Sequence, residues 1–321
     1  MTALRLGSHG DEVRRLQQRL AALSLYRGPI DGDYGGGTRA AVLSFQQAEG
    51  LAADGVVGPR TWRALFEQDI PVPEIARKDL ATRCLALTGA FETSTGFPDC
   101  FCGISGDFDG QGISFGVLQW NFGQGSLQPM LQEMIERHAD LARSIFGDHL
   151  EVLANALRAD RDELLAFARS VQHPVTHAVF EPWRGLARSL GRTAEFQDIQ
   201  KEHAASRFQQ ALALCRDYDL QSERAAALMF DIVVQNGSIS RTVKASILAD
   251  FRSIPSSLDK DEAEVRRMEI VANRRAEASN PRWVDDVRAR KLCIARGEGK
   301  VHGVQYHTQD QFGIGLKPFQ G

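Results

Sequence analysis

Features typical of membrane and metal proteins are missing from this chain. No apolar run approaches the roughly 18 residues that a membrane-spanning helix requires, and no charged, then apolar leader opens the sequence. The five cysteines lack paired C-x-x-C spacing, and the sequence contains no H-E-x-x-H motif. We therefore expect a chain without membrane insertion, metal or other cofactor.

An excess of charge of one sign is also missing. The sequence has 38 Lys and Arg against 41 Asp and Glu, a net charge of −3. Such a balance creates no long-range field that would recruit nucleic acid, so we expect no nucleic-acid partner. His173 and His177 are four residues apart, but Pro174 between them disfavours the helix that would bring both onto one face.

What the sequence does contain is an internal repeat near its N-terminus. The pattern D-G-x-x-G-x-x-T-x-x-A, followed by an apolar residue, occurs at 31–42 and again at 54–65. In each copy an Asp-Gly turn leads to a threonine whose hydroxyl we expect to cap the start of a helix. An apolar helical stripe precedes both copies, at Val13, Leu16, Leu20 and Leu23. These segments predict a compact three-helix domain over residues 1–68.

This repeat resembles the type 1 peptidoglycan-binding domain. The matching features are the segment 7–13, both Asp-Gly turns, the Phe-Gln pair at 45–46 and the second threonine of the repeat. The resemblance implies that the face beside the turns binds glycan or stem peptide, so peptidoglycan is the expected partner. The candidate ligand-binding residues on this face are Asp31, Tyr34, Gln46 and Asp54.

Two prolines separate this domain from the rest of the chain. They forbid a continuous helix through residues 69–75, which we therefore predict to be a linker. Residues 76–321 can bury a core of their own, and their apolar residues mostly recur with the 3.6-residue period of helices. Only 113–120 and 300–314 suggest strands. The predicted fold is mainly α, with a small three-helix domain and a larger α-helical, lysozyme-like domain that has a small β element at its cleft.

The most informative residue of the larger domain is a glutamate at the end of a predicted helix. Apolar residues at steps of three to five predict a helix over 74–91, with Glu92 at its C-terminal end. The negative end of the helix dipole and the apolar Phe91 would raise the pKa of this carboxyl, as a general acid requires. A glycine-rich turn with Asp107 and Asp109 follows, and it could carry a second carboxylate.

This region resembles the lysozyme-like superfamily. Residues 91–94 and 109–114 resemble the chitosanase pattern of a helix-terminal Glu, a D-G-x-G turn and a hydroxyl residue. In that pattern the Glu is the acid, the Asp of the turn is the base, and the hydroxyl helps to hold the attacking water. The match implies these roles for Glu92, Asp109 and Ser114.

A second branch of the superfamily matches the next segment. Residues 115–120, FGVLQW, resemble the F-G-L-M-Q strand of goose-type lysozymes and lytic transglycosylases, which implies that Gln119 faces the sugar cleft. Asn121 stands where goose-type enzymes have a second Asp, and Asp107 competes with Asp109 for the role of base. The identity of the base therefore stays open.

Two neighbouring amides further along the chain are also candidates for sugar binding. Gln235 and Asn236 end a predicted apolar helix and could donate to sugar hydroxyls or N-acetyl groups. Alternatively they only precede a helix C-cap, with Gly237 as the left-handed residue.

A wall-binding domain joined to a glycosidase would concentrate its polymeric substrate around the catalytic cleft. We therefore predict a monomeric cell-wall muramidase that hydrolyses the β-1,4 bond between N-acetylmuramic acid and N-acetylglucosamine, with Glu92 as general acid. A lytic transglycosylase, a chitosanase-like glycosidase and a non-catalytic wall-binding protein are the alternatives. The domain order resembles that of phage endolysins, which are made in the host cytoplasm without a signal peptide and reach the periplasmic wall after release. An effector delivered by a secretion machine would also fit.

Overall fold

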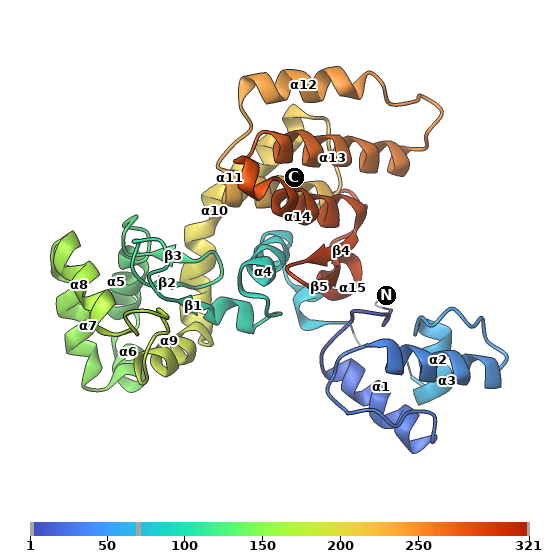
Figure 1. Cartoon of the computed structure of the whole chain (residues 1–321), viewed down its shortest axis with the longest axis horizontal. Helices are drawn as coiled ribbons and strands as arrows, with labels where there is room; N and C mark the ends of the chain where they lie inside the picture. The colour runs from blue at the N-terminus through green and yellow to red at the C-terminus, as the bar shows by residue number, and fades with distance from the viewer. Residues whose placement is uncertain (1–2, 69–71, 320–321) are drawn as a thin grey trace. The chain divides into compact units, whose positions relative to one another are not determined.

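The computed structural model describes residues 3–68 and 72–319 (Figure 1). The chain divides into two compact units, one of Met1–Cys84 and Ala211–Gly321, the other of Leu85–Gln210. Helices dominate both, and the sheets of the described residues are one of three short strands and one two-stranded hairpin. The prediction of a mainly α protein with a small β element is confirmed. The predicted boundaries at residues 68 and 76 stay a prediction, since residues 69–71 lie outside the described part.

Three helices form the N-terminal domain in the first unit. They are α1 (Asp11–Ala22), α2 (Gly36–Ala48) and α3 (Pro59–Phe66). Their apolar faces meet in one core that includes the predicted stripe residues Val13, Leu16 and Leu20, together with Tyr34, Val42, Phe45, Val57 and Trp62. The prediction that Leu23 continues this stripe is wrong, because Leu23 follows the last residue of α1 and is exposed.

One buried glutamine fixes each copy of the repeat. The Gln17 side chain donates to the Asp31 carboxylate (2.8 Å) and accepts from the backbone N–H of Gly32 (2.9 Å). Gln46 repeats this arrangement in the second copy, with the Asp54 carboxylate (2.9 Å) and the N–H that follows it (2.9 Å). The Asp-Gly turns therefore have the same internal scaffold.

The expectation that the threonines of the repeat cap the helices is wrong. The residues that precede α2 and α3 are Gly35 and Gly58, and neither helix start has a side-chain cap. Thr38 and Thr61 are the third residues of these helices, and their hydroxyls accept from the amides of Gln17 and Gln46 at 3.3 and 3.2 Å. The threonines thus complete the buried networks instead.

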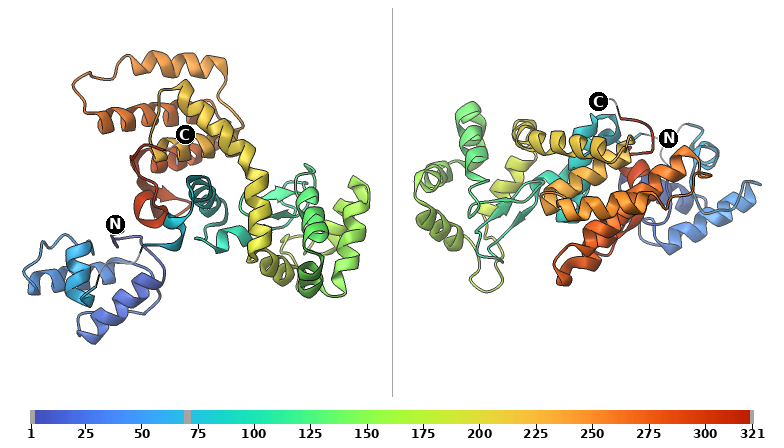
Figure 2. Two further views of the ribbon diagram at one scale, coloured as in Figure 1. Left: turned by 180° about the vertical axis from the view of Figure 1, so that it is seen from behind. Right: turned by 90° about the horizontal axis from the view of Figure 1, so that it is seen from above.

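The rest of the first unit is a helical bundle with one hairpin. Helix α11 is buried along most of its length, and α13 lies alongside both α12 and α14 (Figure 2). No described helix is both long and apolar enough to cross a membrane. The elements are η1 (Glu74–Arg77), α11 (Glu223–Asn236), α12 (Arg241–Phe251), α13 (Lys260–Glu277), η3 (Pro281–Trp283), α14 (Val284–Arg296), β4 (Glu298–Val301), β5 (Val304–His307) and α15 (Thr308–Phe312).

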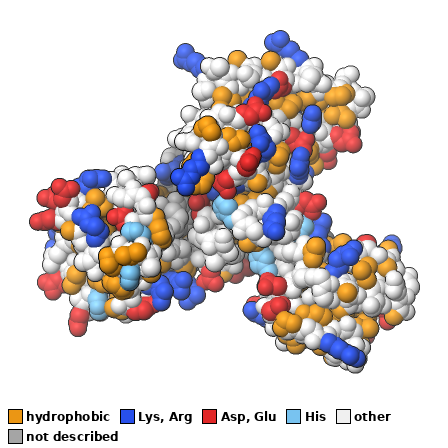
Figure 3. All heavy atoms as spheres, viewed as in Figure 1, with side chains coloured by type: hydrophobic (Ala, Val, Ile, Leu, Met, Phe, Trp, Pro, Cys, Tyr) orange, Lys and Arg blue, Asp and Glu red, His pale blue; other side chains and the backbone are white. Residues whose placement is uncertain are grey.

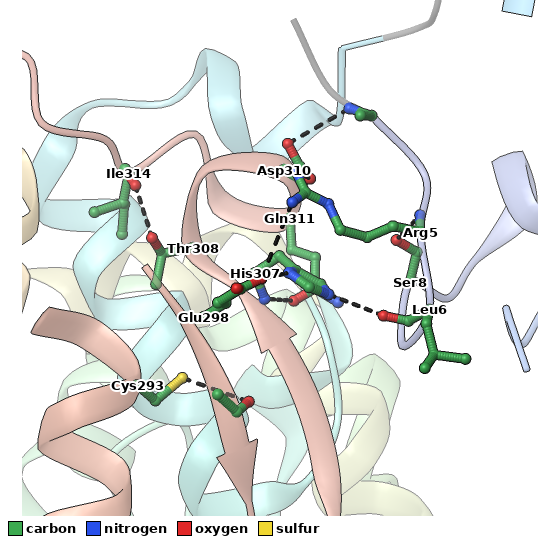
Figure 4. A network of polar contacts seen from close by, with 12 residues as sticks. Arg5, Leu6, Ser8, Cys293, Glu298, His307, Thr308, Asp310, Gln311 and Ile314 are labelled. Carbon is green, nitrogen blue, oxygen red and sulfur yellow. Dashed lines mark hydrogen bonds and ion pairs between the residues drawn. The ribbon is translucent and has the colours of Figure 1, made fainter. Parts of the chain in front are cut away.

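Within this unit the segment before α1 is bonded to β5 and α15 (Figure 4). The Arg5 guanidinium forms an ion pair with Asp310, and His307 Nε2 donates to the carbonyl oxygen of Leu6 at 2.9 Å. Gly7 has a φ of 87°, and a Cβ on it would lie 2.3 Å from the Gln305 side chain. Glycine is therefore required for this close approach.

The second unit combines short helices with the three-stranded sheet. The strands are antiparallel in the order β1-β2-β3, and Ser105, Ser114 and Asn121 lie opposite one another on one face. The elements are η2 (Asp99–Cys102), β1 (Ile104–Ser105), β2 (Ser114–Phe115), β3 (Trp120–Asn121), α5 (Gln128–Arg137), α6 (Ala139–Phe146), α7 (His149–Arg158), α8 (Arg161–Ser170) and α9 (Trp183–Gly191).

Two helices, α4 (Leu80–Thr93) and α10 (Ala194–Asp217), contain the unit boundaries. The predicted start of the first at residue 74 is wrong. The Asp79 carboxylate accepts from the backbone N–H and the hydroxyl of Thr82 (2.9 and 2.7 Å), so the helix begins anew after η1.

The surface charge agrees with the balanced composition. On the face that Figure 3 shows, basic and acidic side chains are interspersed over each part of the chain.

Candidate active site

A polar cleft of about 400 Å³ opens at the C-terminal end of α4 in the second unit. We call it the Glu92 cleft. Its lining residues come from the end of α4, from η2, from β1, from the turn between β2 and β3, and from the end of α9. They are Glu92, Thr93, Thr95, Asp99, Cys102, Gly103, Ile104, Ser105, Gln119, Arg188 and Arg192.

Glu92 lies where the buried part of α4 ends. The preceding residues from Leu85 to Phe91 are buried, whereas Glu92 is exposed in the last turn of the helix. A Cβ on Gly89 would lie 2.1 Å from the Val117 side chain, so glycine allows α4 to approach the turn between β2 and β3. Ser94 has a φ of 56° and ends the helix, which leaves the glutamate at the cleft.

Gln119 forms part of the cleft beside Glu92, with its amide bonded inside the loop. Its Nε2 donates to the carbonyl oxygens of Gly103 (3.0 Å) and Gly116 (2.9 Å), and its Oε1 accepts from the Ser105 hydroxyl (2.8 Å). The backbone of Gln119 is left-handed, with a φ of 53°. The residue predicted to face sugar therefore also holds β1 against the turn.

A further glutamine, which no sequence pattern marks, supports the cleft from behind. Gln200 on α10 is fully buried. Its Oε1 accepts from the N–H of Val117 (2.8 Å), and its Nε2 donates to the carbonyl oxygen of Phe101 (3.2 Å). It thereby ties η2 to the turn that carries Gln119.

Three charged residues of the cleft were also not predicted: Asp99, Arg188 and Arg192. Asp99 Oδ1 accepts from Nη2 and Nε of Arg192 at 3.1 and 3.2 Å. Arg188 lies one turn earlier on α9, a helix that the apolar pattern did not predict. No motif in the sequence connects these residues with Glu92.

The predicted bases lie in the glycine-rich loop and do not line the Glu92 cleft. Asp107 Oδ1 accepts from the N–H of Gly112 (2.9 Å), and Asp109 Oδ1 accepts from the N–H of Gln111 (3.1 Å). Both carboxylates therefore order the loop. Ser114 lies on β2 opposite Ser105, which does line the cleft. The catalytic roles given to these loop and strand residues stay predictions.

The N-terminal domain has a separate cleft of about 530 Å³ beside its first Asp-Gly turn. Asp31 lines it, and hydrogen bonds from the Asp33 N–H and the Gln17 amide lower the pKa of this carboxyl. Tyr34 is buried and donates to the carbonyl oxygen of Gly55 (3.0 Å).

The other two candidates of this domain, Gln46 and Asp54, hold the second turn. Gln46 is buried, and the Asp54 carboxylate accepts from the N–H of Val56 (2.8 Å), which lowers its pKa. Direct ligand contacts for all four candidates stay a prediction.

The amides predicted at 235–236 belong to the first unit. Gln235 Oε1 accepts from Lys291 Nζ (2.6 Å), and Gly237 follows the helix with a φ of 77°. The alternative of a helix C-cap at Gly237 is confirmed. Sugar binding by Gln235 and Asn236 stays a prediction.

All five cysteines are free and buried. Burial is the main cause that raises the pKa of the Cys102 thiol to about 11, which disfavours a thiolate nucleophile in the Glu92 cleft. Among the described residues, no group of three or more His, Cys, Asp or Glu side chains is arranged to hold a metal ion.

Residues 9–65 match the family model "Putative peptidoglycan binding domain". The predicted resemblance of the N-terminal domain is thereby confirmed. The chain is 48% identical over 58 residues to the N-acetylmuramoyl-L-alanine amidase CwlM of Mycobacterium tuberculosis, which covers 18% of this chain and 14% of that protein. It is 47% identical over 66 residues to the zinc D-Ala-D-Ala carboxypeptidase of Streptomyces albus G, covering 19% and 25%. The chain thus spans a quarter or less of these two relatives.

Solved structures align with a larger part of the chain, at low similarity. A native chitosanase from Bacillus subtilis MY002 covers 69% of this chain and 87% of its own, with 18% identity and a TM-score of 0.42. An endolysin of the Burkholderia AP3 phage covers 74% and 100%, with 20% identity and a TM-score of 0.20. Both TM-scores are below 0.5, so neither comparison establishes the fold of the larger part of the chain.

Proposed function

We propose that this protein binds peptidoglycan through its N-terminal domain and cleaves the glycan strands with Glu92 as general acid. The observation that carries the proposal is an exposed glutamate at the end of a buried helix, in a polar cleft, in a chain whose residues 9–65 match a peptidoglycan binding family. The cleft volume of about 400 Å³ is within the usual range of ligand sites.

The N-terminal match supports the target but not the reaction. The relatives that share it are named for different reactions, an amidase and a carboxypeptidase. The reaction is inferred from the Glu92 cleft instead. A carboxylic acid there would protonate the glycosidic oxygen as the C–O bond breaks and charge develops on the sugar ring.

The reaction that we favour is hydrolysis of the β-1,4 bond between N-acetylmuramic acid and N-acetylglucosamine. In this reaction a second carboxylate, Asp109 or Asp107, activates the attacking water. The glycine-rich loop that carries both would have to present one of them to the sugar. Binding of the wall by the N-terminal domain would raise the local concentration of the strands.

One observation favours a lytic transglycosylase as the second candidate. Besides Glu92, the carboxylate that lines the cleft is Asp99, and it is paired with Arg192. If no second carboxylate takes part, Glu92 acts as acid and then as base, and the 6-hydroxyl of muramic acid closes on C1 to give a 1,6-anhydro product.

Mass spectrometry of fragments released from purified peptidoglycan tests the proposal. Glu92→Gln keeps the size of the side chain and removes its proton donor, so we expect the release rate to fall by about 10²–10⁴-fold. Glu136→Gln, a change at an exposed glutamate on α5, is the matched control and should leave the rate unchanged.

The products decide between the candidates. Reducing ends identify a hydrolase, and anhydro ends identify a transglycosylase. Cut peptides on intact glycan strands, or an unchanged rate in Glu92→Gln, would refute Glu92-dependent glycan cleavage.

A further inference from the structure

Two arginines line the Glu92 cleft: Arg188 is in the last turn of α9, and Arg192 is the C-cap residue of that helix. Arg188 and Arg192 are four residues apart, which places them on the same face of a helix. A cleft that selects a glycan with ammonium groups would present carboxylates at the end of α9. This one presents guanidinium groups.

The end of α9 reaches the cleft because a glycine lies at its contact with η2. A Cβ on Gly191 would lie 2.8 Å from both Cys102 Cα and the carbonyl oxygen of Phe101. Any larger residue would push the helix end away from η2. The basic pair is therefore held by backbone packing and does not depend on flexible side chains alone.

The two arginines of the cleft differ in their ion pairing. Arg192 is paired with Asp99, and both side chains are more than half exposed. Arg188 forms no ion pair within residues 3–68 and 72–319. The guanidinium of Arg188 is therefore available to an anionic group of a ligand in the cleft.

We propose that Arg188, with Arg192 beside it, selects glycans that carry a carboxylate next to the bond to be cleaved and rejects glycans that carry ammonium groups. This inference rests on the proposed function and deepens it, because it assigns the substrate to muramic-acid polymers and excludes glucosamine polymers. A guanidinium binds a carboxylate through two parallel hydrogen bonds, whereas a glucosamine ammonium would be repelled.

The carboxylate can have two sources in peptidoglycan. One is the lactyl group of muramic acid, which is free where the stem peptide has been removed. The other is the stem peptide itself. The chemistry that Arg188 would recognise is the same in both, so the substrates of the experiment must separate them.

The test compares Arg188→Gln with Arg184→Gln as a matched control. Arg184 is exposed on the same helix, pairs with Glu181 (2.7 Å) and does not line the cleft. The substrates are peptide-bearing strands and strands stripped of peptide by an amidase. Both kinds of strand are also tested after their carboxylates have been converted to amides, and chitosan is the glycan with ammonium groups.

We expect Arg188→Gln to lower kcat/KM on a carboxylated strand about tenfold, the low end for a hydrogen-bonded charge pair at an exposed site. On the amidated strand the same change should alter kcat/KM by less than about twofold, and Arg184→Gln should behave like the parent protein on both. An effect on stripped strands assigns the lactyl carboxylate, and an effect on peptide-bearing strands alone assigns the peptide carboxylate. Faster cleavage of chitosan than of either strand by the parent, or equal losses on carboxylated and amidated strands, would overturn the inference while leaving a glycosidase.

If the parent protein cleaves none of these polymers, the proposed function fails, and binding still decides the inference. Calorimetric titration of the same strands into Glu92→Gln and Glu92→Gln/Arg188→Gln should show weaker binding of carboxylated strands by the double variant. Equal affinities would refute the role of Arg188.

Discussion

Replacing Gln119 by alanine or by glycine separates two properties of this residue. Its amide makes three hydrogen bonds within the cleft, to Gly103, Gly116 and Ser105. Its backbone has a φ of 53°, a conformation that strains any residue with a Cβ. Alanine removes the hydrogen bonds and keeps the strain, whereas glycine removes both.

The magnitudes follow from these contacts. A typical hydrogen bond has a net value of about 0.5–1.5 kcal/mol, and water in the half-buried cleft replaces part of what is lost. We therefore expect Gln119→Ala to lower the free energy of unfolding by about 1–3 kcal/mol. Relief of the left-handed strain is about 1–2 kcal/mol, and the greater freedom of glycine in the unfolded chain offsets about half of it. Gln119→Gly should thus be more stable than Gln119→Ala by about 0.5–1 kcal/mol.

Urea unfolding followed by tryptophan fluorescence measures both differences, since Trp120 is the buried neighbour of Gln119. Gln124→Ala is the control, because Gln124 is exposed in the same region and should shift stability by less than about 0.5 kcal/mol. If the alanine variant is as stable as the parent, or more stable than the glycine variant, this account of the cleft is refuted. Unchanged stability with a raised KM would instead show that the amide binds sugar directly.

Two further predictions concern the buried polar groups of the first unit. Gln46→Ala leaves the second Asp-Gly turn without its scaffold. It should therefore lower the free energy of unfolding of the intact protein by about 2–4 kcal/mol and weaken its sedimentation with peptidoglycan. Gln47→Ala, at the exposed neighbouring residue, is the control and should do neither. Asp231 is fully buried against Arg290 (2.6 Å) and Lys291. Burial raises the pKa of its carboxyl, but the two cations together lower that pKa by more, so the net shift is downward. Its stabilisation is therefore present above the ordinary Asp pKa near 4 and is lost as the pH falls through the lowered value. Asp231→Asn should destabilise by about 3–5 kcal/mol at pH 7, and the difference from the parent should shrink at pH 2–3 in denaturant melts; a constant difference would contradict this.

The elements that the sequence predicted well are those whose pattern is local. The repeat at 31–42 and 54–65 specifies two turns and two helix starts within a few residues of each other. Glu92 follows apolar residues at helical spacing, so its place at the end of a helix could be predicted from that spacing alone. The prediction about the threonines failed because a hydroxyl near the start of a helix can accept from a buried amide instead of capping the helix.

The charged groups of the Glu92 cleft could not be predicted in the same way. Their positions depend on how η2, the β2–β3 turn and α9 pack, and these elements are far apart in sequence. Gln200 illustrates the difficulty, since nothing near it in the sequence marks it as the residue that joins two of these segments. A polar residue in the middle of a long helix ordinarily faces solvent.

The glycines explain why the chemistry of the cleft depends on tertiary packing. Gly89 lets α4 approach the turn below Glu92, and Gly191 lets α9 approach η2, so one glycine positions the acid and the other positions the basic pair. Neither glycine has a left-handed φ, so neither is required by its own turn. Their small size matters only because another segment passes within contact distance, a fact that local sequence does not contain. A homologue with larger residues at both positions could keep every predicted helix and still lack the juxtaposition of an acid and two guanidinium groups on which the proposed substrate selection depends.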